Sequence, residues 1–157
     1  MVLPSYLKKG DTVAIIATAR KVSKEEIQPA VAFFESYGLC VVLGKNLFES
    51  SNQYAGTDAQ RTEDLQWALN DKTIKAIIIA RGGYGSVRTI EQIDFTEFKK
   101  HPKWMVGYSD VTVLHNAIHK IGVATLHATM PLNFTKNEEA TKSMVNALFG
   151  NLTQIET

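Results

Sequence analysis

The residues best suited to chemistry stand in one short segment, Gly107-Tyr108-Ser109-Asp110. An apolar run leads into this segment and an amphipathic pattern follows at once, so a strand would pass into a helix with no loop between them. A serine on such a turn resembles a nucleophile elbow, where the hydroxyl is exposed beside the unpaired N–H groups of a helix N-terminus. We therefore interpret Ser109 as a candidate nucleophile and the Asp110 N–H as a candidate oxyanion donor.

Spacing alone favours a plainer interpretation of the same turn. Ser and Asp are common N-cap residues, so Ser109 or Asp110 could simply cap the following helix. The hydrolase pattern also lacks its second glycine, because Val111 stands in that place. A serine nucleophile further needs a proton acceptor within hydrogen-bond reach. None of the 4 histidines has a sequence context that marks it as this base.

A glycine-rich segment, Arg81-Gly82-Gly83-Tyr84-Gly85-Ser86, follows the clearest strand-like run. Glycines at a strand end let backbone N–H groups approach a ligand closely. A dinucleotide fingerprint would need a third glycine where Arg88 stands, and no P-loop motif is present. The segment could supply a second oxyanion donor, or it could be a tight turn with glycines for steric reasons alone. The charged Arg81 and the Tyr84 ring favour a ligand site.

The remaining residue types with chemical potential receive structural interpretations. His115 and His119 are four residues apart, as in a zinc helix, but Asn116 stands where the general base is needed, so we predict no metal site. His127 closes a strand and is interpreted as structural. Cys40 is interpreted as a small core residue within a strand.

Five apolar runs of strand length alternate with helix-like segments, and two capping boxes, Ser23 with Glu26 and Thr57 with Gln60, open the first two helices. Such alternation indicates βαβ units. We predict an α/β fold with a doubly wound, mostly parallel sheet and helices on both faces, flavodoxin- or Rossmann-like, in a single domain. The expected strands are 12–17, 39–43, 76–80, 104–108 and 124–127, and the expected helices follow Ser23, Thr57 and Asp110 or span 87–93 and 138–149.

The carboxyl ends of the strands in such a sheet are where ligands bind. Three of these ends carry distinctive residues, namely Thr18-Ala19-Arg20, residues 81–86, and Ser109-Asp110. We therefore expect the chemistry of the protein at this edge of the sheet.

The composition narrows the class of protein further. The chain has 157 residues, 45% of them hydrophobic and 21% charged, which is typical of one globular domain and excludes a disordered chain. A net charge of +1 gives no support for nucleic acid or an anionic membrane as partner. No apolar run is long enough to span a bilayer, and the start of the chain does not fit a signal peptide. The single cysteine is consistent with a cytoplasmic location.

Three motifs together resemble the LD-carboxypeptidases, the muramoyltetrapeptide carboxypeptidase family of serine peptidases, which also includes microcin self-immunity hydrolases. The first motif is Tyr54-Ala55-Gly56-Thr57-Asp58 with Arg61 and Asp64-Leu65. The second is residues 80–85, and the third is residues 106–115. The match follows the order and spacing of the family over nearly the whole chain.

The resemblance implies roles for individual residues. Ser109 would be the nucleophile, the N–H groups of Asp110 and Gly83 the oxyanion donors, and Arg81, Gly82 and Tyr84 would bind substrate. The family's catalytic Glu and His belong to a separate C-terminal domain and have no matching positions here. We therefore expect residues 1–150 to form the nucleophile-bearing domain, residues 151–157 to begin a linker, and this chain alone to be inactive.

The resemblance also implies a reaction: hydrolysis of the L-to-D amide bond that releases terminal D-alanine from a murein tetrapeptide during cytoplasmic peptidoglycan recycling. It implies no metal or organic cofactor, and family members are commonly homodimers. Two segments depart from the family pattern, residues 17–20 and His127-Ala128-Thr129-Met130, and both bear on the choice of substrate. The alternatives are a microcin-immunity-type hydrolase acting on a peptidyl-nucleotide, or a non-catalytic module that binds an anion or peptide.

Overall fold

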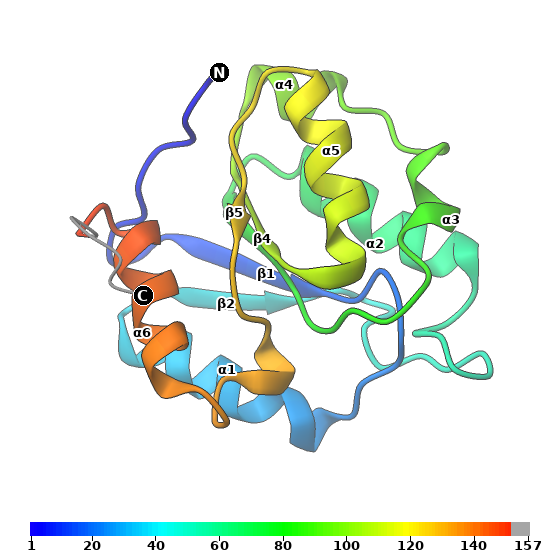
Figure 1. Ribbon diagram of the computed structural model, residues 1–157, viewed down its shortest axis with the longest axis horizontal. Coiled ribbons are helices and arrows are strands. Elements are labelled where there is room, and N and C mark those ends of the chain that lie inside the picture. Colours follow the sequence, from blue (N-terminus) through cyan, green and yellow to red (C-terminus); the bar gives the residue numbers. More distant parts are fainter. Residues whose placement is uncertain (152–157) are drawn as a thin grey trace.

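The computed structural model describes residues 1–151 and contains one parallel sheet with the strand order β2-β1-β3-β4-β5 (Figure 1). This order and the all-parallel pairing confirm the predicted doubly wound α/β fold and match the flavodoxin-like arrangement. The strands are β1 Thr12–Ile16, β2 Cys40–Leu43, β3 Ile74–Ile79, β4 Trp104–Gly107 and β5 Leu126–His127.

Helices cover both faces of the sheet because alternate side chains of the central strands point to opposite sides. Val13 and Ile15 of β1 pack in one buried cluster with α1 and α6, whereas Ala14 and Ile16 pack in a second cluster with α2, α4 and α5. The helices are α1 Lys24–Ser36, α2 Asp58–Asn70, α3 Val87–Ile90, α4 Thr96–Lys100, α5 Thr112–Lys120 and α6 Glu138–Leu148, with short 3-10 turns η1 Ser109–Val111 and η2 Pro131–Asn133.

Both predicted capping boxes are present. The Ser23 hydroxyl accepts a hydrogen bond from the Glu26 N–H, and the Glu26 carboxylate accepts one from the Ser23 N–H. Thr57 and Gln60 make the same reciprocal pair at the start of α2. Each box satisfies two N–H groups that a helix start would otherwise leave unpaired, so both helices begin where the sequence predicts.

Several local predictions differ from the structure. The helix expected over 87–93 ends at Ile90, and α4 was not predicted, because its five residues are too few to show an amphipathic period. The interpretation of Cys40 as a core residue is wrong. It is exposed on β2, which is an edge strand of the sheet and pairs with β1. The expected linker over 151–157 lies, apart from Asn151, outside the described residues.

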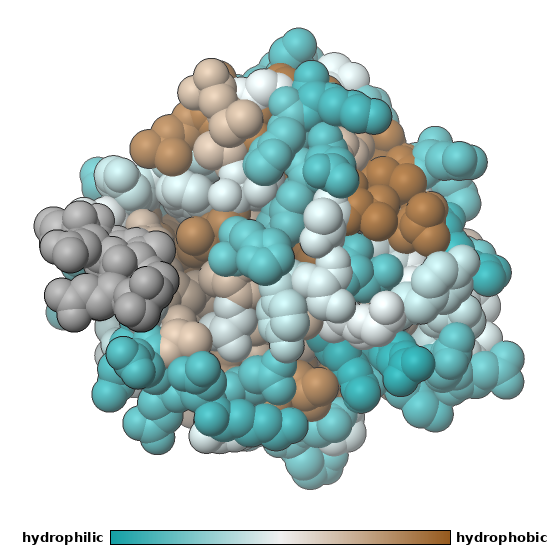
Figure 2. All heavy atoms as spheres, viewed as in Figure 1, coloured by the Kyte–Doolittle hydropathy of each residue, from teal (hydrophilic) through white to brown (hydrophobic). Residues whose placement is uncertain are grey.

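Figure 2 shows one face of the molecule, on which hydrophilic residues predominate and brown, hydrophobic patches lie near the N-terminal segment and toward α3. The exposed large hydrophobic residues include Met1, Val2, Leu3 and Val87. Within residues 1–151, no helix is long and apolar enough to cross a membrane.

Candidate active site

Ser109 is the first residue of η1, two residues after the end of β4, and its backbone is left-handed, with φ of +61°. This conformation is uncommon for a residue with a side chain, and it persists only where the surrounding structure imposes it. Gly107 makes the turn tight, because a Cβ there would lie 2.9 Å from Cγ2 of Val111. The hydroxyl-bearing residue is exposed at the carboxyl edge of the sheet, as a nucleophile elbow requires.

The alternative interpretation of this turn, a simple N-cap, is wrong. In the described part of the chain, neither η1 nor α5 has a side-chain hydrogen bond at its N-cap, and the N-cap residues are Tyr108 and Val111. The Asp110 carboxylate bonds elsewhere, as described below. Ser109 is therefore held in a strained conformation that capping does not explain.

The glycine-rich segment after β3 lies against this turn. A Cβ built on Gly82 would be 3.4 Å from the Ser109 Cβ and 3.5 Å from its Oγ, so the loop backbone borders the hydroxyl. Gly83 and Gly85 have φ of +119° and +151°, which side-chain-bearing residues rarely adopt. The segment thus brings main chain, rather than side chains, to the serine.

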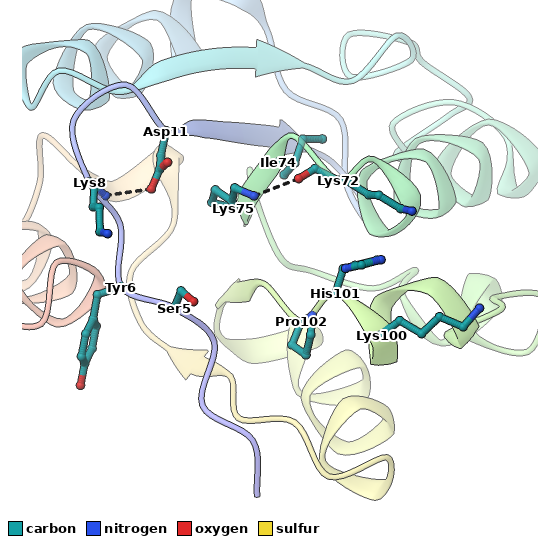
Figure 3. Close-up of a pocket in the computed structure, with 10 residues that line it drawn as sticks. All are labelled: Ser5, Tyr6, Lys8, Asp11, Lys72, Ile74, Lys75, Lys100, His101 and Pro102. Atoms are coloured by element: carbon teal, nitrogen blue, oxygen red, sulfur yellow. Dashed lines mark hydrogen bonds between the residues drawn. The ribbon is translucent and has the colours of Figure 1, made fainter.

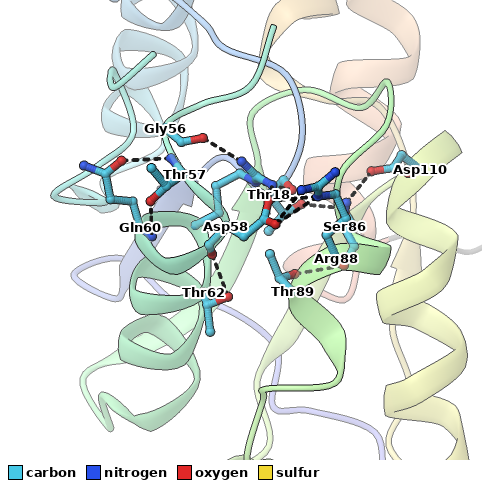
Figure 4. Close-up of polar contacts among 11 residues, drawn as sticks. Thr18, Gly56, Thr57, Asp58, Gln60, Thr62, Ser86, Arg88, Thr89 and Asp110 are labelled. Atoms are coloured by element: carbon cyan, nitrogen blue, oxygen red, sulfur yellow. Dashed lines mark hydrogen bonds and ion pairs between the residues drawn. The ribbon is translucent and has the colours of Figure 1, made fainter. Parts of the chain in front are cut away.

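Hydrogen bonds join three strand ends at this edge (Figure 4). The Asp110 carboxylate accepts a hydrogen bond from the Ser86 N–H at 2.9 Å. The Ser86 hydroxyl in turn lies 2.7 Å from that of Thr18, and both side chains are buried. The ends of β1, β3 and β4, each singled out from the sequence, are therefore linked through Ser86.

Arg61 of α2 donates hydrogen bonds to two main-chain segments near the same edge of the sheet. Its side chain is fully buried, and it donates to the carbonyls of Thr18 at 3.1 Å and Gly56 at 2.7 Å. It also forms an ion pair with Asp58. A guanidinium can donate to several acceptors in one plane, so a single side chain fixes the end of β1 to the loop before α2.

Asp58 connects Arg61 to α3 by accepting hydrogen bonds from Arg88. Its carboxylate accepts two close hydrogen bonds from Arg88, from Nε at 2.9 Å and from Nη2 at 2.8 Å. These bonds, more than the contact with Arg61, lower the pKa of Asp58 below its usual value. The Tyr54 ring packs against both guanidiniums, with centroid distances of 4.8 Å to Arg61 and 5.4 Å to Arg88. The first family motif therefore connects the end of β1 with α3, the helix that directly follows the glycine loop.

Arg81 and Tyr84 belong to the glycine-rich segment, and Arg20 lies beside it at this edge of the sheet. Arg81 is half-buried, and its Nη1 donates to the Lys21 carbonyl at 3.3 Å. Tyr84 is 49% exposed and thus accessible to a ligand. Arg20 is exposed and its side chain covers Gly83, whose Cβ would lie 2.7 Å from the Arg20 Cδ. Arg20 was not predicted as a site residue, although its place at the end of the first strand was a signal.

Three of the 4 histidines lie on α5 or at the end of β5, and the fourth, His101, is exposed just before β4. His115 is buried and its Nε2 bonds the Gly107 carbonyl. His119 is exposed and bonds the Thr125 hydroxyl. His127 is exposed at the end of β5 and lines a cavity of about 440 Å³ together with Tyr108, Ala128 and Thr129. Within residues 1–151, no hydrogen bond joins a histidine to Ser109, and no group of three or more His, Cys, Asp or Glu could hold a metal ion.

A second cavity, of about 520 Å³, lies near the starts of β1, β3 and β4, at the opposite edge of the sheet from Ser109 (Figure 3). Four lysines line it, Lys8, Lys72, Lys75 and Lys100, together with one acidic residue, Asp11. Glu97 lies 3.9 Å from Lys72 and 2.7 Å from Lys100, so its single negative charge offsets one of these two positive charges. This cavity is too far along the strands to take part in chemistry at Ser109.

The model of the LD-carboxypeptidase N-terminal domain matches residues 13–128, which include the Ser109 turn and the glycine loop. The chain belongs to the LD-carboxypeptidase family. The resemblance stated from the sequence motifs is thereby confirmed.

Relatives of this LD-carboxypeptidase domain include a probable murein peptide carboxypeptidase of Bacillus subtilis, which is 43% identical over 81% of this chain and 40% of its own length. Among solved structures, an MccF-like protein of Bacillus anthracis is 30% identical, with a TM-score of 0.86 over 94% of this chain and 47% of its own. A muramoyltetrapeptide carboxypeptidase of Oxalobacter formigenes is 27% identical, with a TM-score of 0.77 over 93% and 49%. The LD-carboxypeptidase domain described here spans about half the length of these relatives or less.

Proposed function

We propose that this chain carries the nucleophile of a serine LD-carboxypeptidase that releases terminal D-alanine from murein tetrapeptide in cytoplasmic peptidoglycan recycling. The observation that carries the proposal is the left-handed, exposed Ser109 on its strand-to-helix turn, bordered by the main chain of the glycine loop at Gly82. Family membership supports the reaction class, and the murein peptide carboxypeptidase of Bacillus subtilis supports the substrate class.

In the proposed reaction, the Ser109 Oγ attacks the carbonyl carbon of the L-to-D amide bond and its proton passes to a base. The negative charge that develops on the carbonyl oxygen is stabilised by the N–H groups of Asp110 and Gly83. The C–N bond then breaks, the amine of D-alanine takes up the proton, and water hydrolyses the acyl-serine. We propose that a Glu and a His outside this chain supply the base and orient it, and the scheme uses no cofactor.

A carboxypeptidase must also recognise the terminal carboxylate of its substrate. Arg81 and Arg20 flank the glycine loop, and a guanidinium binds a carboxylate through two parallel hydrogen bonds. We propose that Arg81, with Gly82 and Tyr84, forms this subsite and that Arg20 contributes a second cation.

Ser109→Ala in the full-length protein tests the proposal. We expect D-alanine release from murein tetrapeptide, followed by an amino-acid assay, to fall by at least about 10³-fold, with the circular dichroism spectrum and unfolding midpoint nearly unchanged. The 157-residue chain alone should show no turnover, because it lacks the proposed base. Rapid release by that chain, or an active Ser109→Ala protein, would refute the proposal.

A second candidate function is hydrolysis of a peptidyl-nucleotide, favoured by the likeness to the MccF-like structure of Bacillus anthracis. The two candidates are separated by supplying murein tetrapeptide and a peptidyl-nucleotide to the same protein and comparing kcat/KM. Binding of a peptide with no turnover of either substrate by the full-length protein would instead indicate a non-catalytic module.

A further inference from the structure

Among the histidines of the described chain, His115 is the one whose side chain hydrogen-bonds the main chain of the nucleophile turn, and it is only 4% exposed. It belongs to α5, and its Nε2 lies 2.9 Å from the carbonyl oxygen of Gly107, the last residue of β4. The same carbonyl also accepts the Ala128 N–H at 3.2 Å. The Gly107 carbonyl thus accepts one hydrogen bond from Ala128, directly after β5, and one from His115 of α5, the helix that follows the turn.

The bond fixes the state of the imidazole. A carbonyl oxygen only accepts, so Nε2 carries the hydrogen and Nδ1 is left as an acceptor. Within residues 1–151, Nδ1 of His115 is the buried side-chain polar atom without a partner. Burial lowers the pKa of His115 more than the hydrogen bond to the Gly107 carbonyl raises it. His127 and His119, whose ring centroids lie 5.8 Å and 6.4 Å away, lower this pKa slightly further.

These observations argue against two simple roles for His115, that of catalytic base and that of a residue needed only for packing. His115 does not suit the role of base for Ser109, because Nε2 is engaged by Gly107 and Nδ1 is buried. Packing alone does not explain it either, since an aliphatic side chain would fill the same place without burying an unpaired nitrogen. What the imidazole adds is the hydrogen bond to the Gly107 carbonyl.

We propose that His115 is a positioning residue for the nucleophile, and that its Nε2–H clamps the Gly107 carbonyl so that Ser109 is held in its left-handed conformation. The clamp closes the chain from residue 107 to residue 115 into a ring around the turn. On the other side of the serine, Asp110 is anchored to the Ser86 N–H. A strained φ persists only where the surroundings over-determine it, and these two anchors bracket Ser109.

The kinetic test compares His115→Gln with His115→Leu in the full-length protein and rests on the proposed function. The Gln amide nitrogen can occupy the place of Nε2 and donate to Gly107, whereas Leu fills the space without a donor. We expect His115→Leu to lower kcat for D-alanine release about 10- to 100-fold with KM nearly unchanged, since a displaced nucleophile costs about this much. His115→Gln should retain kcat within about threefold.

His119→Leu is the matched control, since it makes the same change one turn further along α5 and should not alter kcat. The clamp is refuted if His115→Leu keeps the wild-type kcat, if His115→Gln falls as far as His115→Leu, or if only KM changes. Should His115→Leu fail to fold, His115→Asn replaces it, because its shorter amide does not reach Gly107.

A structural readout separates failure of the clamp from failure of the proposed function. Backbone couplings and chemical shifts of Ser109 report its φ by NMR whether or not the protein releases D-alanine. We expect a positive φ in the wild-type and His115→Gln proteins and loss of it in His115→Leu, together with an Nε2-bound hydrogen on His115 in the wild type. A positive φ at Ser109 in His115→Leu would overturn the inference even if the enzyme assay succeeds.

Discussion

A single serine with a left-handed backbone distinguishes this site from an ordinary helix start. The neighbouring glycines serve it in different ways. At Gly82 the place of a Cβ lies 3.5 Å from the Ser109 Oγ, so the absence of a side chain there keeps the hydroxyl accessible. At Gly85 a Cβ would lie 2.9 Å from the Ala19 Cα, so the absence of a side chain lets two backbones pack. The first glycine serves access and the second serves folding.

Alanine at each position separates these two roles. Gly85→Ala should lower the free energy of unfolding by at least about 2 kcal/mol, because it combines an unfavourable φ with a clash against backbone. Gly82→Ala should leave stability within about 1 kcal/mol, yet lower kcat/KM of the full-length protein by at least about tenfold, because its methyl group borders the hydroxyl. Urea unfolding and D-alanine release measure the two effects. Equal losses of stability in both variants would contradict the distinction.

The elements around the site are held by polar contacts at their ends rather than by the hydrophobic clusters alone. Arg61 ties the end of β1 and the loop before α2 together, and Asp58 passes the connection to α3 through Arg88. The glycine loop leads directly into α3, so the contacts of Arg61, Asp58 and Arg88 that hold α3 also position this loop. A buried guanidinium is effective here since its hydrogen-bond acceptors come from separate segments.

Removing either arginine tests this anchor. Arg61→Met should lower the free energy of unfolding by about 3–5 kcal/mol, because two buried carbonyls and a carboxylate lose their shared donor. Arg88→Met is the matched control: Arg88 bonds the same Asp58, but its side chain is 45% exposed, so this substitution should lower the free energy of unfolding far less than Arg61→Met. Urea unfolding at pH 7 measures both. Comparable losses would show that Arg61 is not the anchor.

Among residues 1–151, Lys103 is a buried ionisable amine, and it lies at the edge of the sheet opposite Ser109. Lys103 is 2% exposed just before β4, and its Nζ donates to the carbonyls of Ala68 and Asp71 at the end of α2. Burial lowers the pKa of Lys103 to about 8. In the unfolded chain a lysine has a pKa of about 10.4. Global stability should therefore depend on pH through this group.

The sign of the effect follows from proton counting. Between pH 8 and about 10.4 the unfolded chain holds a proton that folded Lys103 has lost, so its contribution to the free energy of unfolding rises with pH, by at most about 1.4 kcal/mol per unit. Below that window both states are protonated and the contribution is flat. Urea unfolding of wild type and Lys103→Met from pH 7 to 10 isolates the group. A constant difference between the two proteins would contradict the lowered pKa.

The sequence by itself determined two helix starts, the fold class and the family, because these depend on residues close together in the chain. Capping boxes at Ser23 and Thr57 placed two helix starts, and the alternation of apolar runs with amphipathic segments predicted the parallel sheet and its two covered faces. Chain order and spacing of the motifs also led to the LD-carboxypeptidase family. These features depend on neighbours in the chain, and so they are visible without coordinates.

Only the tertiary structure decided which groups meet. Whether Ser109 caps a helix or sits strained on an elbow depends on its φ, and the turn around it is held by contacts from Ala128 after β5, from α5 and from the glycine loop. The burial of His115, the exposure of Cys40 and the role of Arg61 likewise depend on segments distant in sequence. The physical reason is that strain, burial and hydrogen-bond partners belong to the packed chain, whereas periodicity and capping belong to its local sequence.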